Sequence, residues 1–459
     1  MTRAAPSIAP RNGVMTSRYH QPLPPPPGEP VSVAAFGAVG DGKTDDTAAV
    51  SAAIKYVQGQ AHRPVLRFPA GAFVLSSSLQ ADTFVVEGAG PANTQLVFSN
   101  TKAAPSSGSA AGGYAFVVGV SWEQLHKDPP CFPGVRNLSI VAGTGTLNGL
   151  LFHSAFQANA VCENVQVSGF AASGAVGVGL CNVQDVPFIN LKVSACWVGL
   201  QLSPAQKPGE KNYNTNLTFI NYVGQSNASW SIGCLPGAGG CDNITFVGGV
   251  SQSAAGTLVN IASCGSLTFL GHYFETPNTK HQELILADVA NATIQGCHFT
   301  SIGAQVIASG QKAHLAVCGC SFPSKFAQEP GRTLPSGARV VLSGGINATV
   351  NACSPQLSVG QGCVATLVGF DHSINTTGGP GRIIDLSNPS PKALLETGKS
   401  TVDQMGPACA YRTGSYDRPY RREVALQWAV LVLLAAGILA LAIVLQDVRA
   451  FQTRVGGPQ

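Results

Sequence analysis

Charged residues are scarce in this 459-residue chain, where Asp, Glu, Lys and Arg make up 11% of the total and about a quarter would be usual. A bundle of amphipathic helices is therefore excluded, since its outer faces need more charge. No long Lys/Arg block occurs, the net charge is +4, and basic residues are not interleaved with aromatics. These absences argue against nucleic acid as a partner. Glycine is abundant instead, with 53 residues, which suits a β-rich body with many tight turns.

The beginning of the sequence also lacks something, namely the apolar stretch of a signal peptide. It continues into QPLPPPPGEP, a polyproline-like spacer that cannot join a core. Residues 1–30 are therefore predicted to be a disordered, Pro-rich lead.

The cysteine count is odd, at thirteen. Cys234 and Cys241 bracket a Pro/Gly loop, and Cys353 and Cys363 lie close in sequence, so either pair could form a disulfide. The simpler interpretation is buried free thiols, because free cysteine packs as a small apolar residue.

One long apolar run stands near the other end, at residues 424–445, with Gln427 as its polar interruption. As a helix it would reach roughly 33 Å, enough for a hydrocarbon core of about 30 Å. It predicts a single-pass transmembrane helix in a lipid bilayer, followed by a short tail at 446–459. The arginines just upstream place the large N-terminal part on the cytoplasmic side by the positive-inside rule. Those arginines are Arg412, Arg418, Arg421 and Arg422.

Seven Asn-x-Ser/Thr sequons and the many cysteines favour the opposite, extracytoplasmic side, where glycosylation occurs. The sequons are at Asn137, Asn216, Asn227, Asn243, Asn291, Asn347 and Asn375.

A four-residue pattern recurs every 23 to 33 residues. It consists of a first residue, which is Asn in seven of nine cases, followed by apolar, polar and apolar residues. Its members begin at Asn137, Asn164, Asn190, Asn216, Asn243, Ser266, Asn291, His314 and Asn347. A repeat of this length indicates a solenoid, and the alternation is that of strands. The sequence thus predicts an all-β parallel β-helix in which these residues form one column of turns. Asn suits such turns because it tolerates the left-handed conformation, which explains five of the sequons without glycans.

The first coil of a solenoid needs a cap. Residues 31–37 are predicted to be an edge strand and GDGKT a turn, after which Thr44 caps a short helix ended by Gly59. The helix has one apolar stripe that would cover the open end of the coils: Val50, Ala53, Ile54 and Val57. The same glycines and lysine match a phosphate loop formally, but no βαβ pattern follows them.

Three motifs in order resemble the start of pectate lyase-superfamily proteins: FGAVGDGKTDDTAAVSAAI, VLRFPAGAFVL and VVEGAGPANTQLVF. The most similar group is the rhamnogalacturonase/epimerase-like domain, which is related to glycoside hydrolase family 28. The resemblance covers about residues 31–350. It implies a right-handed parallel β-helix that acts on or binds polysaccharide, with the first Asp residues in a structural cap. Spike-like relatives suggest a homotrimer by analogy.

The expected domain order follows from these features. A β-helix occupies 31–353, its C-terminal end and a juxtamembrane linker occupy 354–423, and the membrane helix comes next.

Candidate catalytic residues are few. Hydrolysis of glycosides needs two carboxyls, and lyases need a base and often Ca²⁺ held by carboxylates. The segment 271–288 has the densest chemistry, with Glu275 predicted to pair with Glu283 or Asp288. Asp185, in CNVQDVP, faintly resembles half of the polygalacturonase double-Asp motif. The alternative for 271–288 is a solvated turn.

Substrate contacts are predicted for His272 and Tyr273 in the same segment, and for the aromatic rings of Trp197 and Tyr222, which could equally belong to the core. His272, Cys297 and Cys320 stack in one column of the repeat. Such a set can bind zinc, but stacked thiols are the simpler interpretation, and no metal site is predicted.

Two functions remain open. The first is a membrane-anchored, carbohydrate-active protein of polysaccharide lyase or glycoside hydrolase type, without a cofactor unless a lyase uses Ca²⁺. The alternative is a non-catalytic β-helix that binds glycans or serves as a structural element of a virion or cell surface.

Overall fold

The computed structural model describes a subset of the chain: residues 29–102, 113–119, 133–144, 148–153, 155, 160–202, 213–234, 240–253, 257–275, 284–300, 306–310, 313–322, 340–344, 346–351, 357–359, 363–368 and 382–385. All of these belong to one compact unit, Met1–Val402. The predicted membrane span at 424–445 and the predicted catalytic Glu283 lie outside the described residues. Among the described residues, no helix has both the length and the hydrophobicity that crossing a membrane requires.

Short strands make up most of the described chain. The N-terminal ones are β1 (Val31–Ser32), β2 (Asp41–Asp45), β3 (Leu66–Arg67), β4 (Gly71–Ser77), β5 (Leu79–Ala81), β6 (Val85–Glu87), β7 (Thr94–Lys102), β8 (Tyr114–Gly119), β9 (Gly134–Ala142) and β10 (Asn148–His153). The middle ones are β11 (Val161–Ser168), β12 (Val176–Cys181), β13 (Pro187–Ser194), β14 (Val198–Gln201), β15 (Tyr213–Ile220), β16 (Val223–Asn227), β17 (Trp230–Cys234), β18 (Gly240–Val247), β19 (Val250–Ser253) and β20 (Val259–Leu270). The last ones are β21 (Tyr273–Glu275), β22 (Leu284–Gln295), β23 (His298–Phe299), β24 (Val306–Ser309), β25 (His314–Cys318), β26 (Val340–Ser343), β27 (Asn347–Asn351), β28 (Leu357–Val359), β29 (Val364–Val368) and β30 (Arg382–Asp385).

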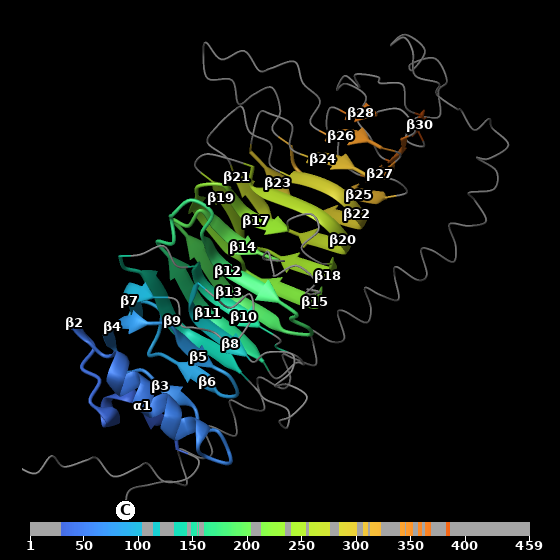
Figure 1. The fold of residues 1–459 in the computed structure, drawn as a ribbon. Coiled ribbons are helices and arrows are strands. Elements are labelled where there is room, and N and C mark those ends of the chain that lie inside the picture. Colours follow the sequence, from blue (N-terminus) through green and yellow to red (C-terminus); the bar gives the residue numbers. More distant parts are fainter. Residues whose placement is uncertain are drawn as a thin grey trace, which may run out of the picture. The chain divides into compact units, whose positions relative to one another are not determined.

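The strands form a parallel β-helix, so the predicted all-β solenoid is confirmed. Each strand pairs in parallel with one from the next coil, as β9 does with β11, β11 with β13, and β20 with β22. Figure 1 shows successive strands stacked in the order of the chain, from the blue coils to the orange ones. Parallel strands need a long connection between them, and here that connection is the remainder of each coil.

The repeated Asn pattern occupies two columns of the β-helix, so the prediction of one column is wrong. The first column runs through Asn137, Asn164 and Asn190, whose strands are adjacent. Its next member is Asn221, whose amide nitrogen donates to the Asn190 side-chain oxygen over 2.9 Å. The following coils have glycine at this turn, for example Gly248 with φ 63°, so the Asn pattern does not continue along this column.

The second column begins at Asp185 and continues through Asn216 and Asn243. The Asn216 amide donates to Asp185, and the Asn243 amide donates to Asn216, over 2.9 and 2.8 Å. The later members of the sequence pattern lie on this column too: Ser266, Asn291, His314 and Asn347. The coil that leads from Asn190 to Asn221 is 31 residues long, so the sequence pattern, whose next member is Asn216, passes from the first column to the second.

Turn chemistry accounts for five residues of the pattern, which have φ between 52° and 57°. They are Asn137, Asn164, Asn190, Asn216 and Asn243. Asn tolerates this left-handed region better than most residues. Asn291 of β22 and Asn347 of β27 are not among the residues with positive φ.

The predicted capping helix is α1 (Thr47–Gln58), which lies beside the first strands at the blue end of the coils in Figure 1. Its buried stripe contains Val50, Ala53 and Val57, which join the apolar core. The helix ends at Gly59, as predicted. Its N-cap is Asp46, not Thr44, because the chain before it is committed to β2, which pairs with β4.

The residues before the helix also differ from the prediction. Residues 31–37 form only the two-residue β1, followed by the 3-10 helix η1 (Val33–Phe36). The buried Asp46 carboxylate accepts the N–H groups of Val39 and Gly40 over 2.6 and 3.1 Å. It therefore holds the loop, as the structural role implied by the family resemblance requires.

The core is a column of aromatic rings that rises coil by coil. Phe188, Phe219, Phe246 and Phe269 stack nearly parallel, with ring centroids 4.6–4.9 Å apart. Each ring is fully buried, which stabilises the fold by about 2–3 kcal/mol per side chain. The ring spacing matches the strand spacing of about 4.8 Å, so each coil adds one ring to the stack.

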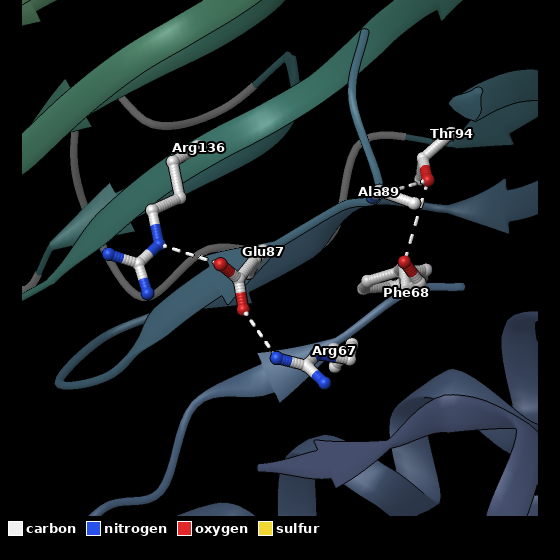
Figure 2. A network of polar contacts seen from close by, with 6 residues as sticks. All are labelled: Arg67, Phe68, Glu87, Ala89, Thr94 and Arg136. Carbon is white, nitrogen blue, oxygen red and sulfur yellow. Dashed lines mark hydrogen bonds and ion pairs between the residues drawn. The ribbon is translucent and has the colours of Figure 1, made fainter. Parts of the chain in front are cut away.

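A ladder of alternating charges lies on the outside of the first coils. Register places Arg67, Glu87, Arg136 and Glu163 on adjacent strands. Figure 2 shows Glu87 between the two arginines, 3.2 Å from Arg67 Nη2 and 3.1 Å from Arg136 Nε. These groups are partly exposed, so each ion pair contributes at most about 1 kcal/mol to the free energy of unfolding. We assign the ladder a role in the fold and none in a functional site.

Candidate functional site

The described acids predicted to be catalytic lie on different columns. Asp185 is exposed in a left-handed turn with φ 56° and accepts the Asn216 amide. Asp288 is exposed within β22, in register with Ser263 of β20. Glu275 lies on β21, in register with Gln252 of β19. The structure therefore does not form a carboxylate pair from these residues, and Glu283 lies outside the described part of the chain.

His272 is a core residue with no exposed surface. Its Nδ1 lies 2.7 Å from the Gly248 carbonyl oxygen, and its Nε2 lies 2.9 Å from the Ser251 hydroxyl. A carbonyl can only accept, so Nδ1 carries the proton and Ser251 donates to Nε2. Burial lowers the pKa of His272 to about 4. Because the His272 side chain has no exposed surface, it cannot contact a substrate directly in this structure, contrary to the prediction.

Tyr222 is also fully buried, and its hydroxyl donates to the Ser231 carbonyl oxygen over 2.7 Å. Its ring meets Phe219 and Phe246 edge-on, so it belongs to the core, as the alternative interpretation held. Trp197 is half-buried and packs against the same core. The Tyr222 ring is therefore not available for stacking on a sugar, and the sugar contact of Trp197 stays a prediction.

Tyr273 and Glu275 both point outward from β21, since Phe274 between them is the buried residue. The Tyr273 ring stacks on the exposed His298 of β23, with centroids 5.2 Å apart and planes 7° apart. Beside them, Gln225, Gln252 and Glu275 form a row on adjacent strands. We call these five residues the Glu275 face.

A second outward surface carries threonines on successive strands, which we call the threonine face. Adjacent strands are about 4.8 Å apart, so the hydroxyls form a regular row. The row consists of Thr218, Thr245, Thr268, Thr293, Thr349 and Thr366.

Ala316 interrupts the threonine row between Thr293 and Thr349. A cavity of about 360 Å³ lies there, lined by these residues and by Asn291 and His314. The lining mixes polar side chains with apolar ones such as Leu315 and Val364, and among the described residues it contains no carboxylate.

The His272, Cys297 and Cys320 column exists as predicted, because His298 N–H donates to the His272 carbonyl and Ser321 N–H to the Cys297 carbonyl. The two thiols point at backbone carbonyls, as Cys320 does toward Ile294 over 3.3 Å. Within the described residues, no three His, Cys, Asp or Glu side chains are grouped to hold a metal ion.

Sequence reasoning missed Gln225, Gln252 and His298 as members of a surface. The repeat contained the necessary signal, because each lies four or two residues after a left-handed Asn or Gly of the first column. Without the correct column for coils after Asn190, these offsets could not be aligned.

The family comparison agrees with the fold. Residues 30–254 match the family model described as rhamnogalacturonase A/epimerase, pectate lyase-like. Residues 30–254 thus belong to the pectate lyase-like right-handed β-helix superfamily, as the three N-terminal motifs predicted. No curated protein matches the sequence in a direct comparison.

Several solved structures are similar in fold. The A-module of mannuronan C-5 epimerase AlgE6 from Azotobacter vinelandii has 14% identity and a TM-score of 0.46, with 82% of this chain and 98% of that one covered. The Streptococcus pneumoniae surface protein and adhesin PfbA has 12% identity and a TM-score of 0.46, with 82% and 99% covered. ORF18 of Geobacillus virus E2 has 14% identity and a TM-score of 0.40, with 78% of this chain covered. The chain spans 61% of the length of that viral protein. At these identities the likeness concerns the fold alone.

Proposed function

We propose that this chain is a carbohydrate-active β-helix protein that binds a polysaccharide on its Glu275 face. The observation that carries the proposal is the outward Tyr273 ring, stacked on His298 beside the row Gln225, Gln252 and Glu275. The match to a pectate lyase-like family model supports it.

The chemistry of this face suits a sugar chain. The Tyr273 ring has an apolar surface and a polar tip, so it can contact the C–H side of a pyranose ring. The two glutamine amides both donate and accept hydrogen bonds, and the Glu275 carboxylate accepts them. Side chains on adjacent strands recur about every 4.8 Å, so successive sugar hydroxyls can meet successive side chains.

The enzymatic form of the proposal gives Glu275 the role of general acid or base in a lyase or hydrolase. Its predicted partner Glu283 is near in sequence, and a lyase would admit Ca²⁺ as a further charge at the site. The non-catalytic form is favoured because, among the described residues, Glu275 has no second carboxylate on its face, since Asp185 and Asp288 lie on other columns. In both forms the partner is a glycan.

The membrane anchor at 424–445 belongs to the proposal on the strength of its 22 apolar residues. The arginines before it favour a cytoplasmic β-helix, and a homotrimer is proposed by analogy with spike-like relatives.

The test is binding of the full chain to a panel of acidic and neutral polysaccharides, with reducing-sugar release and unsaturated-uronate absorbance measured in parallel. Tyr273→Ala should weaken binding about tenfold, the upper range for loss of an aromatic contact. Glu275→Gln should retain binding and abolish any cleavage. Thr245→Ala, outward on the threonine face, is the matched control and should leave both unchanged.

Two outcomes would contradict the proposed site. Unchanged binding in Tyr273→Ala would remove the ring from it, and full cleavage by Glu275→Gln would remove the carboxylate from catalysis. If only Thr245→Ala lost binding, the glycan-binding site would be on the threonine face and not on the Glu275 face.

A further inference from the structure

Three buried cysteines meet at the junction of β17, β18 and β20. The Sγ atoms of Cys234 and Cys241 are 3.1 Å apart. Cys241 also lies directly opposite Cys264 on the adjacent strand. All three are at most 2% exposed. Two thiols in such contact need little movement to reach bonding distance, which is about 2.0 Å.

We propose that Cys234 and Cys241 are a disulfide site, and that Cys264 remains a free thiol beside it. The two cysteines are seven positions apart in sequence, at the end of β17 and the start of β18. Cys264 is held differently, because its thiol donates to the Ser266 carbonyl oxygen over 3.3 Å. The Cys241 thiol also contacts Cys264, but the hydrogen bond to Ser266 directs the Cys264 thiol toward its own strand.

The electrostatics of the pair agree with the geometry. The contact between the two sulfurs lowers the pKa of Cys234 and raises the pKa of Cys241, which the neighbouring Cys264 raises further. In the folded pair, Cys234 is therefore the thiol that ionises first.

The reaction can be written with a small disulfide such as oxidised glutathione as the oxidant. The Cys234 thiolate attacks one glutathione sulfur, forms a mixed disulfide, and releases one glutathione thiolate. Cys241 then loses its proton to solvent and attacks the Cys234 sulfur, which releases the second glutathione. Two cysteines are oxidised and one glutathione disulfide is reduced to two thiols. Because both sulfurs are buried in the folded chain, the exchange is expected during folding.

The experiment uses the full chain, refolded from its reduced and denatured form in a buffer of oxidised and reduced glutathione. The product is alkylated in denaturant and cleaved on the amino side of Asp242. This cut leaves Cys234 and Cys241 on one peptide and Cys264 on another. The first peptide also contains Cys196, so it should carry one alkyl group, on Cys196, and be lighter by two hydrogen atoms at Cys234 and Cys241. The Cys264 peptide should be alkylated. Reduction before alkylation should make all three cysteines reactive.

Two variants sharpen the result. Cys264→Ser should still form the bond, and Cys241→Ser should leave Cys234 fully alkylated. Alkylation of both cysteines in the oxidised wild-type chain would overturn the proposal. So would a cross-link from either of them to Cys264, to Cys196 or to any other cysteine, which the peptide masses together with the fragment ions of the first peptide would reveal. The same bond in protein from its natural source would indicate an oxidising compartment, contrary to the side that the arginines predict.

Discussion

The buried His272 should make the β-helix sensitive to mild acid. Its pKa is lowered to about 4 from an ordinary 6.5, because burial disfavours the charged ring. In the unfolded chain the ring protonates near pH 6.5, so below that value the unfolded state binds the proton that the folded state excludes. Stability should therefore be complete above about pH 6.5 and should fall as the pH decreases toward 4.

The size of this effect follows from the shift. The full difference corresponds to roughly 3 kcal/mol of unfolding free energy, and about 2 kcal/mol of it should already be lost at pH 5. A loss of 2 kcal/mol is substantial for a domain stabilised by about 5–15 kcal/mol. A small movement cannot bring the His272 ring into contact with solvent, because the rings of Phe246, Phe269 and Phe274 pack around it.

Urea unfolding followed by circular dichroism at pH 7.5 and pH 5.0 would measure the loss. The variant His272→Gln keeps a donor and an acceptor at the site but has no titrating ring, so its stability should change about 2 kcal/mol less between the two pH values than that of the wild type. His298→Gln removes an exposed histidine and serves as the control, which should behave like the wild type. Equal pH dependence in the wild type and in His272→Gln would refute the reasoning.

Three further changes test the fold. Phe246→Ala removes the middle ring of the stack and should lower the unfolding free energy by about 3–5 kcal/mol in urea titrations; a loss below 1 kcal/mol would contradict the ring column as a main source of stability. In Gly248→Ala, no atom lies within 4 Å of the added Cβ, but the residue must keep a φ of 63°. The backbone strain alone should lower the unfolding free energy by about 1–2 kcal/mol. A thermal melt unchanged from that of the wild type would contradict the left-handed conformation. Asp46→Ala removes the carboxylate that accepts the N–H groups of Val39 and Gly40 and should cost about 2 kcal/mol. Hydrogen exchange should accelerate at both residues, and protection that persists there would show another acceptor.

Much of the architecture could be predicted from the residues because its signals are local. An αL turn favours Asn or Gly wherever it occurs, and a strand alternates its side chains with a period of two. Asn137, Asn164 and Asn216 carry the first signal, and the apolar stripe of Val50, Ala53 and Val57 carries that of the helix. These preferences act within a few residues, so the β-helix and its capping helix are encoded locally.

The composition of the Glu275 face could not be predicted from the sequence, because it depends on how neighbouring coils are aligned. The 31-residue coil between Asn190 and Asn221 moves the pattern from one column to the other, and the resulting register places Gln225, Gln252 and Glu275 in a row. Local sequence cannot reveal that shift, because each strand is aligned by hydrogen bonds to a strand about 25 residues away in the chain.

By itself, then, the sequence determined that this chain winds into parallel coils with a helix over the first of them, since backbone preferences and apolar periodicity are properties of short segments. Only the tertiary structure decided which side chains meet. It placed His272 and Tyr222 in the core, separated Asp185, Glu275 and Asp288, and brought Cys234 to Cys241, because the stacking register joins residues that no short segment contains.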